Sequence, residues 1–349
     1  MTKPTINDVA RLAGVSKGAV SFAFNNRPGI STQTRERILA AAAELGWSPS
    51  RRARALSVSR SLAVGLVMAR PPETLRADPF FPSFIAGVEG ELSRHGYALL
   101  LQIVAEHESE HDSYRRLASE GRVDGVLLTD LHVDDDRPAL LAELGLPAVI
   151  VGPNLGEAFW PAVGVDDGPG VTAAVEHLLA LGHTRIAHVA GPGDLVHGKS
   201  RRAAWARTLE KAGLPEGDCI ETDFSAEEGA KATRTLLDLA QAPTAIVFAN
   251  DLMAIAGLAV AVGRGIDVPG RLSIIGYEDT ELAAHMQPPL TTVSTDVIGW
   301  GRAAAGRLLA LIQDRPRLLA LIQDRPAGDL DLQAPRLVVR GSTASPAPG

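Results

Sequence analysis

One octet in the middle of the chain has the residue types and spacing of a phosphate-binding loop. Residues 193–200 read Gly-Asp-Leu-Val-His-Gly-Lys-Ser and match the pattern G-x-x-x-x-G-K-[ST], between an apolar strand-like run and a helical one. In that context backbone N–H groups and the lysine hold a phosphate, and a nucleotide-hydrolysing enzyme is therefore a rival hypothesis for this chain. We find no clean apolar strand that ends in an aspartate suited to magnesium, and this counts against the hypothesis.

The remaining reactive side chains form no catalytic or metal-binding pattern. Cys219 is the single cysteine, which excludes a disulfide framework and a cysteine-rich metal site. Among nine histidines only His107 and His111 have the i,i+4 spacing of one helix face, and neither an H-E-x-x-H nor a G-x-S-x-G motif is present. We therefore expect no catalytic residue, no metal site and no cofactor.

Charge is divided unevenly along the chain. Residues 1–60 contain ten Lys or Arg against three Asp or Glu, so their net charge is +7. Residues 61–349 contain 24 against 38, so theirs is −14. This asymmetry is typical of a small domain that meets a polyanion while the rest of the chain does not.

The basic segment has the pattern of three short helices. Thr5 begins a capping box before a first helix, which Gly14 ends. Ser16 caps a second helix, and Ser31 caps a third that Gly46 stops. Two short helices joined by a tight turn predict a helix-turn-helix, whose second helix fits the major groove of DNA.

The rest of the chain alternates strand-like and helical segments. The apolar, strand-like runs cover residues 63–68, 99–104, 125–128, 148–151, 185–190, 244–249 and 272–277. Amphipathic helical segments between them include residues 85–95, 171–181, 202–212 and 253–262. The alternation predicts α/β lobes, each a parallel sheet with helices on both faces, and a chain of this length divides into two of them. Ligands bind beyond the carboxyl ends of such strands, which predicts a site in the cleft between the lobes.

Hydropathy predicts the cellular location of the protein. No run of about 18 apolar residues is present, and the first residues lack the apolar core of a signal peptide. We expect a soluble, cytoplasmic protein without a membrane partner. An exported solute-binding protein, a further class that two such lobes suggest, is disfavoured for the same reason.

A long, ordered set of residues runs through the predicted helix-turn-helix and beyond it: Ile6-Asn7-Asp8-Val9-Ala10, Ala13-Gly14-Val15-Ser16, Val20-Ser21, Asn25, Ser31, Thr34-Arg35, Pro49, Ala53-Arg54 and Leu56. This set resembles the DNA-binding head of the lactose-repressor-like (LacI/GalR) family of transcription regulators. The resemblance implies a regulator, expected to be a repressor, that binds a pseudo-palindromic operator as a homodimer or a dimer of dimers. It also implies a periplasmic-binding-protein-like sensor of two doubly wound, parallel-sheet lobes, controlled by a sugar or sugar derivative in the cleft.

The resemblance assigns the DNA contacts of the second helix. Base reading is expected from Lys17, Gly18 and Phe22, of which the phenylalanine stands where family members often have arginine. Because Phe22 offers only apolar contact and Gly18 has no side chain, direct readout is expected to be thin. The predicted set is completed by Ser16 and Ser21, suited to phosphate contacts, and by Asn25.

Residues 48–60 resemble the family's hinge. The resemblance implies that this segment folds on DNA, where Leu56 opens a central base step of the minor groove and Arg51 and Arg54 lie beside it. The alternative is a flexible linker whose arginines remain in solvent.

The resemblance also names effector contacts. Lys199 stands where many members have an arginine, and lysine lacks the planar fork that binds two groups at once. Phe224 matches an aromatic on which a sugar stacks. Asn250 and Glu278 match polar cleft residues, with helix capping as their alternative role. The first cleft helix is expected to add an aromatic side chain, Phe80 or Phe81, for which core packing is the alternative.

The expected parts of the chain are a small, all-α head at 1–47, the hinge at 48–60, an N-terminal lobe at 61–162 and 292–340, a C-terminal lobe at 163–291, and a disordered tail at 341–349. An identical ten-residue copy at 307–316 and 317–326 interrupts the family pattern, and we expect its first proline, Pro316, to end a helix.

Overall fold

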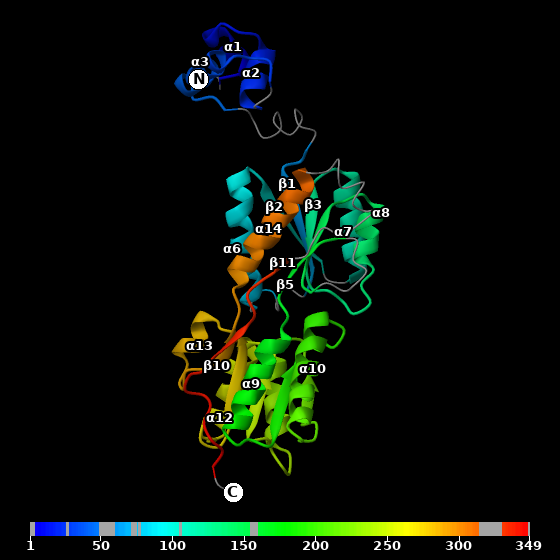
Figure 1. Ribbon diagram of the computed structural model, residues 1–349, viewed down its shortest axis with the longest axis vertical. Helices are drawn as coiled ribbons and strands as arrows, with labels where there is room; N and C mark the ends of the chain where they lie inside the picture. The colour runs from blue at the N-terminus through cyan, green and yellow to red at the C-terminus, as the bar shows by residue number, and fades with distance from the viewer. Residues whose placement is uncertain are drawn as a thin grey trace. The chain divides into compact units, whose positions relative to one another are not determined.

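The structure is a computed structural model that describes residues 4–25, 28–48, 60–70, 75, 78–104, 107–153, 160–313 and 330–347. The chain separates into two compact units, the head, Met1–Leu62, and the body, Ala63–Gly349 (Figure 1). Within the described ranges no helix combines the length and the apolar character needed to cross a membrane. The predicted hinge contacts Arg51, Arg54 and Leu56, and Pro316 of the repeat, lie outside the described residues.

The head contains the three predicted helices, α1 (Ile6–Ala13), α2 (Lys17–Phe24) and α3 (Thr32–Glu44). Ser16 and Ser31 cap α2 and α3, each accepting a hydrogen bond from a backbone N–H at 3.2 Å. Gly14 and Gly46 follow α1 and α3 with φ of 62° and 61°, a left-handed conformation that costs glycine little. The helices enclose one small core made of Val9, Ala10, Ala13, Val20, Ala23, Ile38, Ala41 and Ala42.

The first lobe of the body is a six-stranded parallel sheet in the order β11-β5-β4-β3-β1-β2. Its strands are β1 (Ala63–Ala69), β2 (Ala98–Val104), β3 (Gly125–Leu128), β4 (Ala148–Val151), β5 (Ala162–Gly164) and β11 (Leu330–Asp331). Its helices are α6 (Phe80–Leu92), α7 (His107–Ser119), α8 (Arg137–Glu143) and α14 (Val297–Gln313), with a short 3-10 turn, η1 (Ser93–His95).

Helices α6 and α14 lie side by side in this lobe (Figure 1). Glycines make the approach possible, because a Cβ at Gly87 would lie 2.1 Å from the Ile298 carbonyl oxygen and one at Gly301 would lie 2.2 Å from that of Phe84. The two helix backbones therefore meet directly. This contact attaches α14 to the first lobe, although α14 follows a strand of the second lobe.

The second lobe has the strand order β12-β10-β9-β8-β6-β7, in which only β12 is antiparallel to its neighbour. Its strands are β6 (Ile186–Ala190), β7 (Cys219–Glu221), β8 (Ala245–Phe248), β9 (Ser273–Glu278), β10 (Thr291–Ser294) and β12 (Arg336–Val338). Its helices are α9 (Gly168–Ala180), α10 (Val196–Lys211), α11 (Ala226–Leu237), α12 (Asp251–Gly263) and α13 (Glu281–His285).

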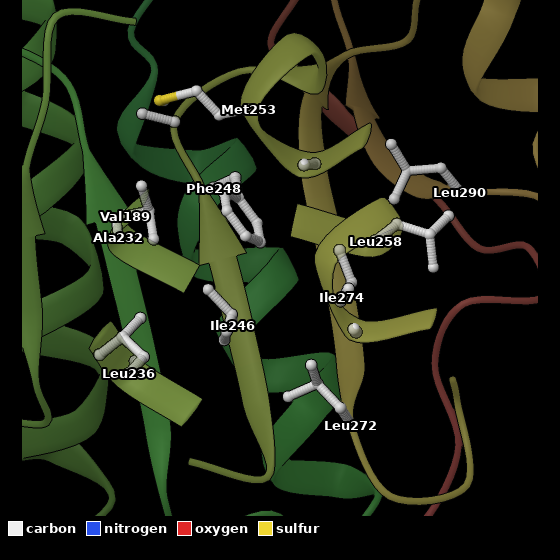
Figure 2. Packing of buried hydrophobic residues seen from close by; sticks show 14 of the residues in the cluster. Val189, Ala232, Leu236, Ile246, Phe248, Met253, Leu258, Leu272, Ile274 and Leu290 are labelled. Carbon is white, nitrogen blue, oxygen red and sulfur yellow. The ribbon is translucent and has the colours of Figure 1, made fainter. Parts of the chain in front are cut away.

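Helices cover both faces of the second sheet, as the sequence predicts. Figure 2 shows side chains from α11 and α12, among them Leu236 and Leu258, packed against Ile246 and Phe248 of β8. On the opposite face α9 and α10 bury a separate cluster that includes Trp205. Strands buried on both faces read as continuous apolar runs, which is why they were predictable.

The predicted lobe boundaries are wrong in three places. Strand β5 belongs to the first sheet, whereas β10 and β12, expected in the first lobe, pair within the second. The chain thus passes between the lobes three times, after β5, β10 and β11. The third passage arises because the very short strands β11 and β12 lie in different sheets.

The tail expected to be disordered from residue 341 is ordered at its start. The Ser342 carbonyl accepts a hydrogen bond from Ile274 N at 2.9 Å, and its hydroxyl accepts one from Thr291 N at 2.8 Å. Ala344 N donates to Ser273 Oγ at 3.1 Å. These bonds complete the edge of the second lobe, which explains why Ser342 is fully buried.

A buried histidine in this lobe makes the stability depend on pH. His188 of β6 donates from Nδ1 to the Val247 carbonyl at 2.8 Å, stacks on Trp205, and has no hydrogen-bond partner at Nε2 within the described part of the chain. Burial, as the main cause, lowers its pKa to about 4. As the pH falls below about 6.5 the unfolded chain takes up this proton first, so the stability is complete above that pH and declines towards pH 4.

We expect the variant His188→Asn, whose amide can keep the bond to Val247, to lose less stability on acidification than the wild type. Between pH 7.5 and pH 5 the free energy of unfolding of the wild type should fall by about 2 kcal/mol more than that of the variant. Urea unfolding at each pH measures both values. Each protein serves as its own control at pH 7.5. Parallel pH curves for the two proteins would contradict the assignment.

Candidate functional site

The second helix of the head presents the predicted base-reading residues to solvent. Lys17 and Gly18 are exposed, and Phe22 is 36% exposed. The Phe22 ring packs over Gly29, where an added Cβ would lie 3.3 Å from the ring. The exposed surface of α2 therefore offers one cation and part of one aromatic ring.

The other predicted residues of α2 also hold the helix together. The hydroxyl of Ser16 is its N-cap, and the amide of Asn25 donates to the carbonyl and the hydroxyl of Ser21 at 2.9 Å and 3.2 Å. Asn25 thereby caps the end of the helix. If Asn25 also contacts a phosphate, the same side chain serves both purposes.

A cleft lies between the two lobes of the body, with about 670 Å³ of space free of protein atoms, part of it open to solvent. It is bounded by the ends of strands from both sheets, and its described wall includes Arg70, Asp130, Arg201, Phe224, Asn250 and Glu278. Predicted residues Phe80, Phe224, Asn250 and Glu278 line it; Phe81 and Lys199 do not.

Arg70, which follows β1, is held rigidly at the first-lobe side of the cleft. Its Nε and Nη2 donate to the two carboxylate oxygens of Asp130 at 2.7 Å each, and its Nη1 donates to Asp78 at 3.3 Å. The guanidinium lies 5.2 Å from the ring centre of Phe81 and 5.7 Å from that of Phe224. Phe81 is 2% exposed, so it packs in the core, as the alternative reading has it.

Helix α10 brings His197 and Arg201 to the cleft and leaves Lys199 exposed. Residues 197 and 201 are one turn apart on the same helix face, and residue 199 is on another. Arg201 donates to the Ala249 carbonyl at 2.6 Å, lies 3.2 Å from Asp167 Oδ2, and covers the Tyr277 ring at 3.9 Å. The basic residue that α10 places on the wall of the cleft is therefore Arg201 and not the predicted Lys199.

Phe224 is not an open stacking platform. It is 5% exposed, and His197 stacks on its ring with the ring centres 5.4 Å apart and an angle of 14° between the planes. Burial, as the main cause, together with Arg201, lowers the pKa of His197 to about 4, so this imidazole is neutral at pH 7. Phe80 and Trp300, edge to face at 5.8 Å, are half-buried aromatic side chains on the wall.

Asn250 serves as a cap. Its Oδ1 accepts a hydrogen bond from Met253 N at 2.8 Å at the start of α12, and its Nδ2 donates to the Phe224 carbonyl at 3.0 Å. One N–H of the amide remains for a ligand. The residue thus positions the Phe224 loop while it lines the cleft.

Glu278 has no such partners. Its Oε2 is buried without a hydrogen bond to any described residue. Burial, as the main cause, with Asp78 and Asp251 nearby, raises the pKa of Glu278 well above its usual range. Behind it, Asp251 fixes the turn after β9 by accepting hydrogen bonds from Thr280 N at 2.7 Å and Thr292 Oγ1 at 2.5 Å.

Three non-glycine residues of the wall have strained backbone. Asp130, Phe224 and Glu278 have φ of 49°, 69° and 116°, and each follows or ends a strand. Such conformations cost of order 1–3 kcal/mol each and cluster at binding sites, where the surrounding structure enforces them.

The loop at 193–200 is not built to hold a phosphate. Gly193 N donates to the Glu221 carboxylate at 2.9 Å, and Val196 N donates to the Leu131 carbonyl at 2.8 Å. A Cβ at Gly198 would lie 2.1 Å from the Pro192 carbonyl oxygen, so this glycine allows the loop to pack on itself. These amides are already bonded and a carboxylate is among their partners, so the geometry does not support the nucleotide-hydrolysing hypothesis.

A helix-turn-helix head and a two-lobed body with a polar cleft define a transcription regulator with a periplasmic-binding-protein-like sensor. Comparison with known proteins agrees on both parts. Residues 5–50 match bacterial regulatory proteins of the lacI family, and residues 175–343 match the periplasmic binding protein-like domain.

Relatives match almost the whole chain. It is 37% identical over 311 residues to the HTH-type transcriptional regulator CelR of Thermobifida fusca, covering 88% of this chain and 91% of that protein. It is 31% identical over 345 residues to the HTH-type transcriptional repressor CytR of Escherichia coli (strain K12), covering 98% and 97%. The chain therefore belongs to the LacI family.

Solved structures give the same result. The structure of the lac repressor dimer bound to operator and the anti-inducer ONPF matches with a TM-score of 0.81 at 29% identity, covering 98% of this chain and 100% of that one. A CelR-cellobiose complex matches with a TM-score of 0.73 at 35% identity, covering 97% and 99%.

Proposed function

We propose that this protein is a cytoplasmic repressor, without enzymatic activity, that binds a pseudo-palindromic operator as a homodimer or a dimer of dimers and releases it when a sugar or sugar derivative binds the cleft. The observation that carries the sensor part is the wall of the cleft, in which half-buried aromatic rings face polar side chains from both lobes. Rings and hydrogen-bonding groups together suit the apolar faces and hydroxyls of a sugar. The CelR relative was solved with cellobiose, which makes this disaccharide the first ligand to try.

The lobes are also joined directly, beside the cleft. Val133 N donates to the Asp194 carbonyl at 2.9 Å, and Val196 N donates to the Leu131 carbonyl at 2.8 Å, so a loop of the first lobe pairs with the start of α10. His132 Nδ1 lies 3.4 Å from Asp194 Oδ2. A ligand that binds one lobe arrangement more tightly than another shifts the balance between the two arrangements. The contacts between residues 131–133 and 194–196 belong to the arrangement described here.

The experiment that tests the function is operator binding with and without a sugar. An operator selected by the protein from a random duplex library is labelled, and its fluorescence anisotropy is followed against protein concentration. We expect cellobiose or another sugar to weaken operator affinity. If no sugar of a broad panel changes it, the effector part of the proposal is wrong.

We propose that α2 reads the operator with Lys17, Gly18 and Phe22, that Ser16, Ser21 and Asn25 support phosphate contacts, and that Arg51, Arg54 and Leu56 act in the minor groove. In the cleft we assign effector contacts to Phe80, Glu278 and Asn250, with Phe224 as their support. To these we add Arg70 and Arg201, which sequence reasoning missed.

Lys17→Ala is expected to weaken operator binding by about 1–3 kcal/mol and to lower the ratio of operator to random-DNA affinity. The physical reason is the loss of the one exposed cation on the reading surface of α2. Titrations at several salt concentrations measure both affinities. Lys211→Ala, which removes an exposed lysine of the body, is the control and should bind as the wild type does. Equal losses on operator and random DNA would show that Lys17 contacts phosphate only.

A further inference from the structure

We propose that Phe22 reads a thymine in each half-site of the operator, by packing its ring against the C5-methyl group of that base. The inference rests on the proposed function, because it assumes that α2 lies in the major groove of operator DNA. It goes further in naming the base, and the chemical group on it, that one side chain recognises. A base that lacks this methyl group should be bound less tightly.

The polar side chains around Phe22 are occupied within the helix. The Ser16 hydroxyl accepts a hydrogen bond from the backbone in the first turn of α2, at 3.2 Å. The Asn25 amide donates to the carbonyl and the hydroxyl of Ser21, at 2.9 Å and 3.2 Å. Groups that are engaged in this way are less able to form the aligned hydrogen bonds that distinguish one base edge from another. The exposed side chains that α2 offers to the bases are those of Lys17 and Phe22.

The Phe22 ring is supported on one edge and exposed elsewhere. A Cβ added at Gly29 would lie 3.3 Å from both Cδ2 and Cε2 of the ring, so the loop before α3 packs against that edge. The residue is nevertheless 36% exposed. One turn earlier on the same helix face is Gly18, where the nearest described atom to an added Cβ would be Ser16 Oγ, at 3.6 Å. Because Gly18 has no side chain, the space on that side of the ring stays open to a base.

An apolar ring distinguishes the bases by the methyl group of thymine. In the major groove thymine presents this methyl group, whereas guanine, cytosine and adenine present hydrogen-bond donors or acceptors. Packing the ring against the methyl group removes apolar surface of both from water. Packing it against another base would displace water from polar groups to which Phe22 offers no hydrogen bond, which is unfavourable. The ring therefore favours thymine and disfavours the other bases.

Uracil tests the methyl contact, because it differs from thymine by the absence of this group alone. Each thymine of the selected operator is replaced in turn, in both half-sites at once, and binding by the full chain is followed by fluorescence anisotropy. We expect a thymine position at which the replacement weakens binding by about fifteenfold, from about fourfold for each of the two buried methyl groups. If no position responds, or if the selected half-sites contain no thymine, the proposal is overturned.

A second base analogue separates the methyl group from the rest of the base pair. At the position found with uracil, the T·A pair is replaced by C·G or by 5-methylcytosine·G, and these two pairs differ in the methyl group alone. We expect the methylated operator to bind about fifteenfold more tightly than the unmethylated one. Equal affinities would show that the methyl group is not what the protein reads, and would overturn the proposal.

Substitution assigns the effect to Phe22. Phe22→Ala is expected to bind the thymine and uracil operators with equal affinity, because the ring that contacts the methyl group is gone. Leu39→Ala, which removes another exposed apolar side chain of the head, is the matched control and should keep the full preference for thymine. Affinity for random duplex, which depends on phosphate contacts, reports whether each variant head is folded. If Phe22→Ala still prefers thymine as strongly as the wild type, another residue reads the methyl group and the proposal is wrong.

The two levels of inference fail in different ways. If the protein selects an operator, and a sugar releases it, but uracil binds as well as thymine at every position, the proposed function stands and the thymine contact is wrong. If thymine is preferred through Phe22 but no sugar changes operator affinity, the effector part of the proposed function fails and the thymine contact stands. If no duplex is selected over random DNA, both fail.

Discussion

Replacing Arg137 with alanine is expected to lower the free energy of unfolding of the body by about 3–5 kcal/mol. Arg137 is 1% exposed and donates to both oxygens of Glu110 at 3.0 Å and 3.1 Å. It also donates to the carboxylate of Asp135, with the shortest contact at 2.6 Å, and to the carbonyl of Asp130 at 2.7 Å. Without the guanidinium, two carboxylates remain in a buried site with no countercharge from residue 137, which explains the size of the effect.

Replacing Arg137 with alanine should also lower the affinity of the cleft for its ligand. Arg137 donates a hydrogen bond to the Asp130 carbonyl and so holds the loop after β3 in place. In this loop Asp130 has a left-handed φ, and its carboxylate accepts hydrogen bonds from Arg70. We therefore expect ligand affinity to fall along with stability. Urea unfolding measures the first effect and calorimetry the second.

Arg115→Ala is the matched control for this prediction. Arg115 pairs with Asp112 at 3.0 Å on the exposed surface of α7, and exposed pairs contribute about 0–1 kcal/mol. The contrast between the two variants tests burial, because both remove an arginine from an ion pair. Similar losses in the two proteins would contradict the role assigned to Arg137.

Those parts of the fold that carry local signals were predictable from the sequence. Strands such as β3 and β8 are buried on both faces and read as apolar runs. Helices α2 and α3 of the head follow serines whose hydroxyls cap them, and α1 and α3 end before glycines. The lobe boundary was not predictable, because β11 and β12 have two and three residues and carry no periodic pattern.

The cleft shows the same division. Phe224 and Glu278 were placed on the wall by the family resemblance, and Glu278 also follows a predicted strand-like run, residues 272–277. Arg201 was missed because the predicted helix began at residue 202, whereas α10 begins at Val196 and turns residues 197 and 201 inward. The Arg70–Asp130 pair joins residues 60 apart, which meet because β1 and β3 are neighbours in the sheet.

Val20→Asp is expected to abolish operator binding, with a loss of more than about a hundredfold, while ligand binding by the body is unchanged. Val20 is fully buried in the small core of the head. A unit of this size rarely gains more than about 3–5 kcal/mol from its core, and an unpaired buried carboxylate costs at least as much. The head should therefore unfold, and with it the surface of α2.

The body should not follow, because it has cores of its own and forms a separate compact unit. Hydrogen exchange followed by mass spectrometry distinguishes the two: peptides from residues 6–44 should lose protection, and peptides from the body should keep it. Phe22→Ala, on the exposed side of the same helix, is the control and should leave exchange in the head unchanged while it weakens operator binding. If Val20→Asp kept operator affinity, the head would not be the DNA-binding element. If the body lost protection as well, the two units would not fold independently, and the route from cleft to DNA would have to include their shared stability.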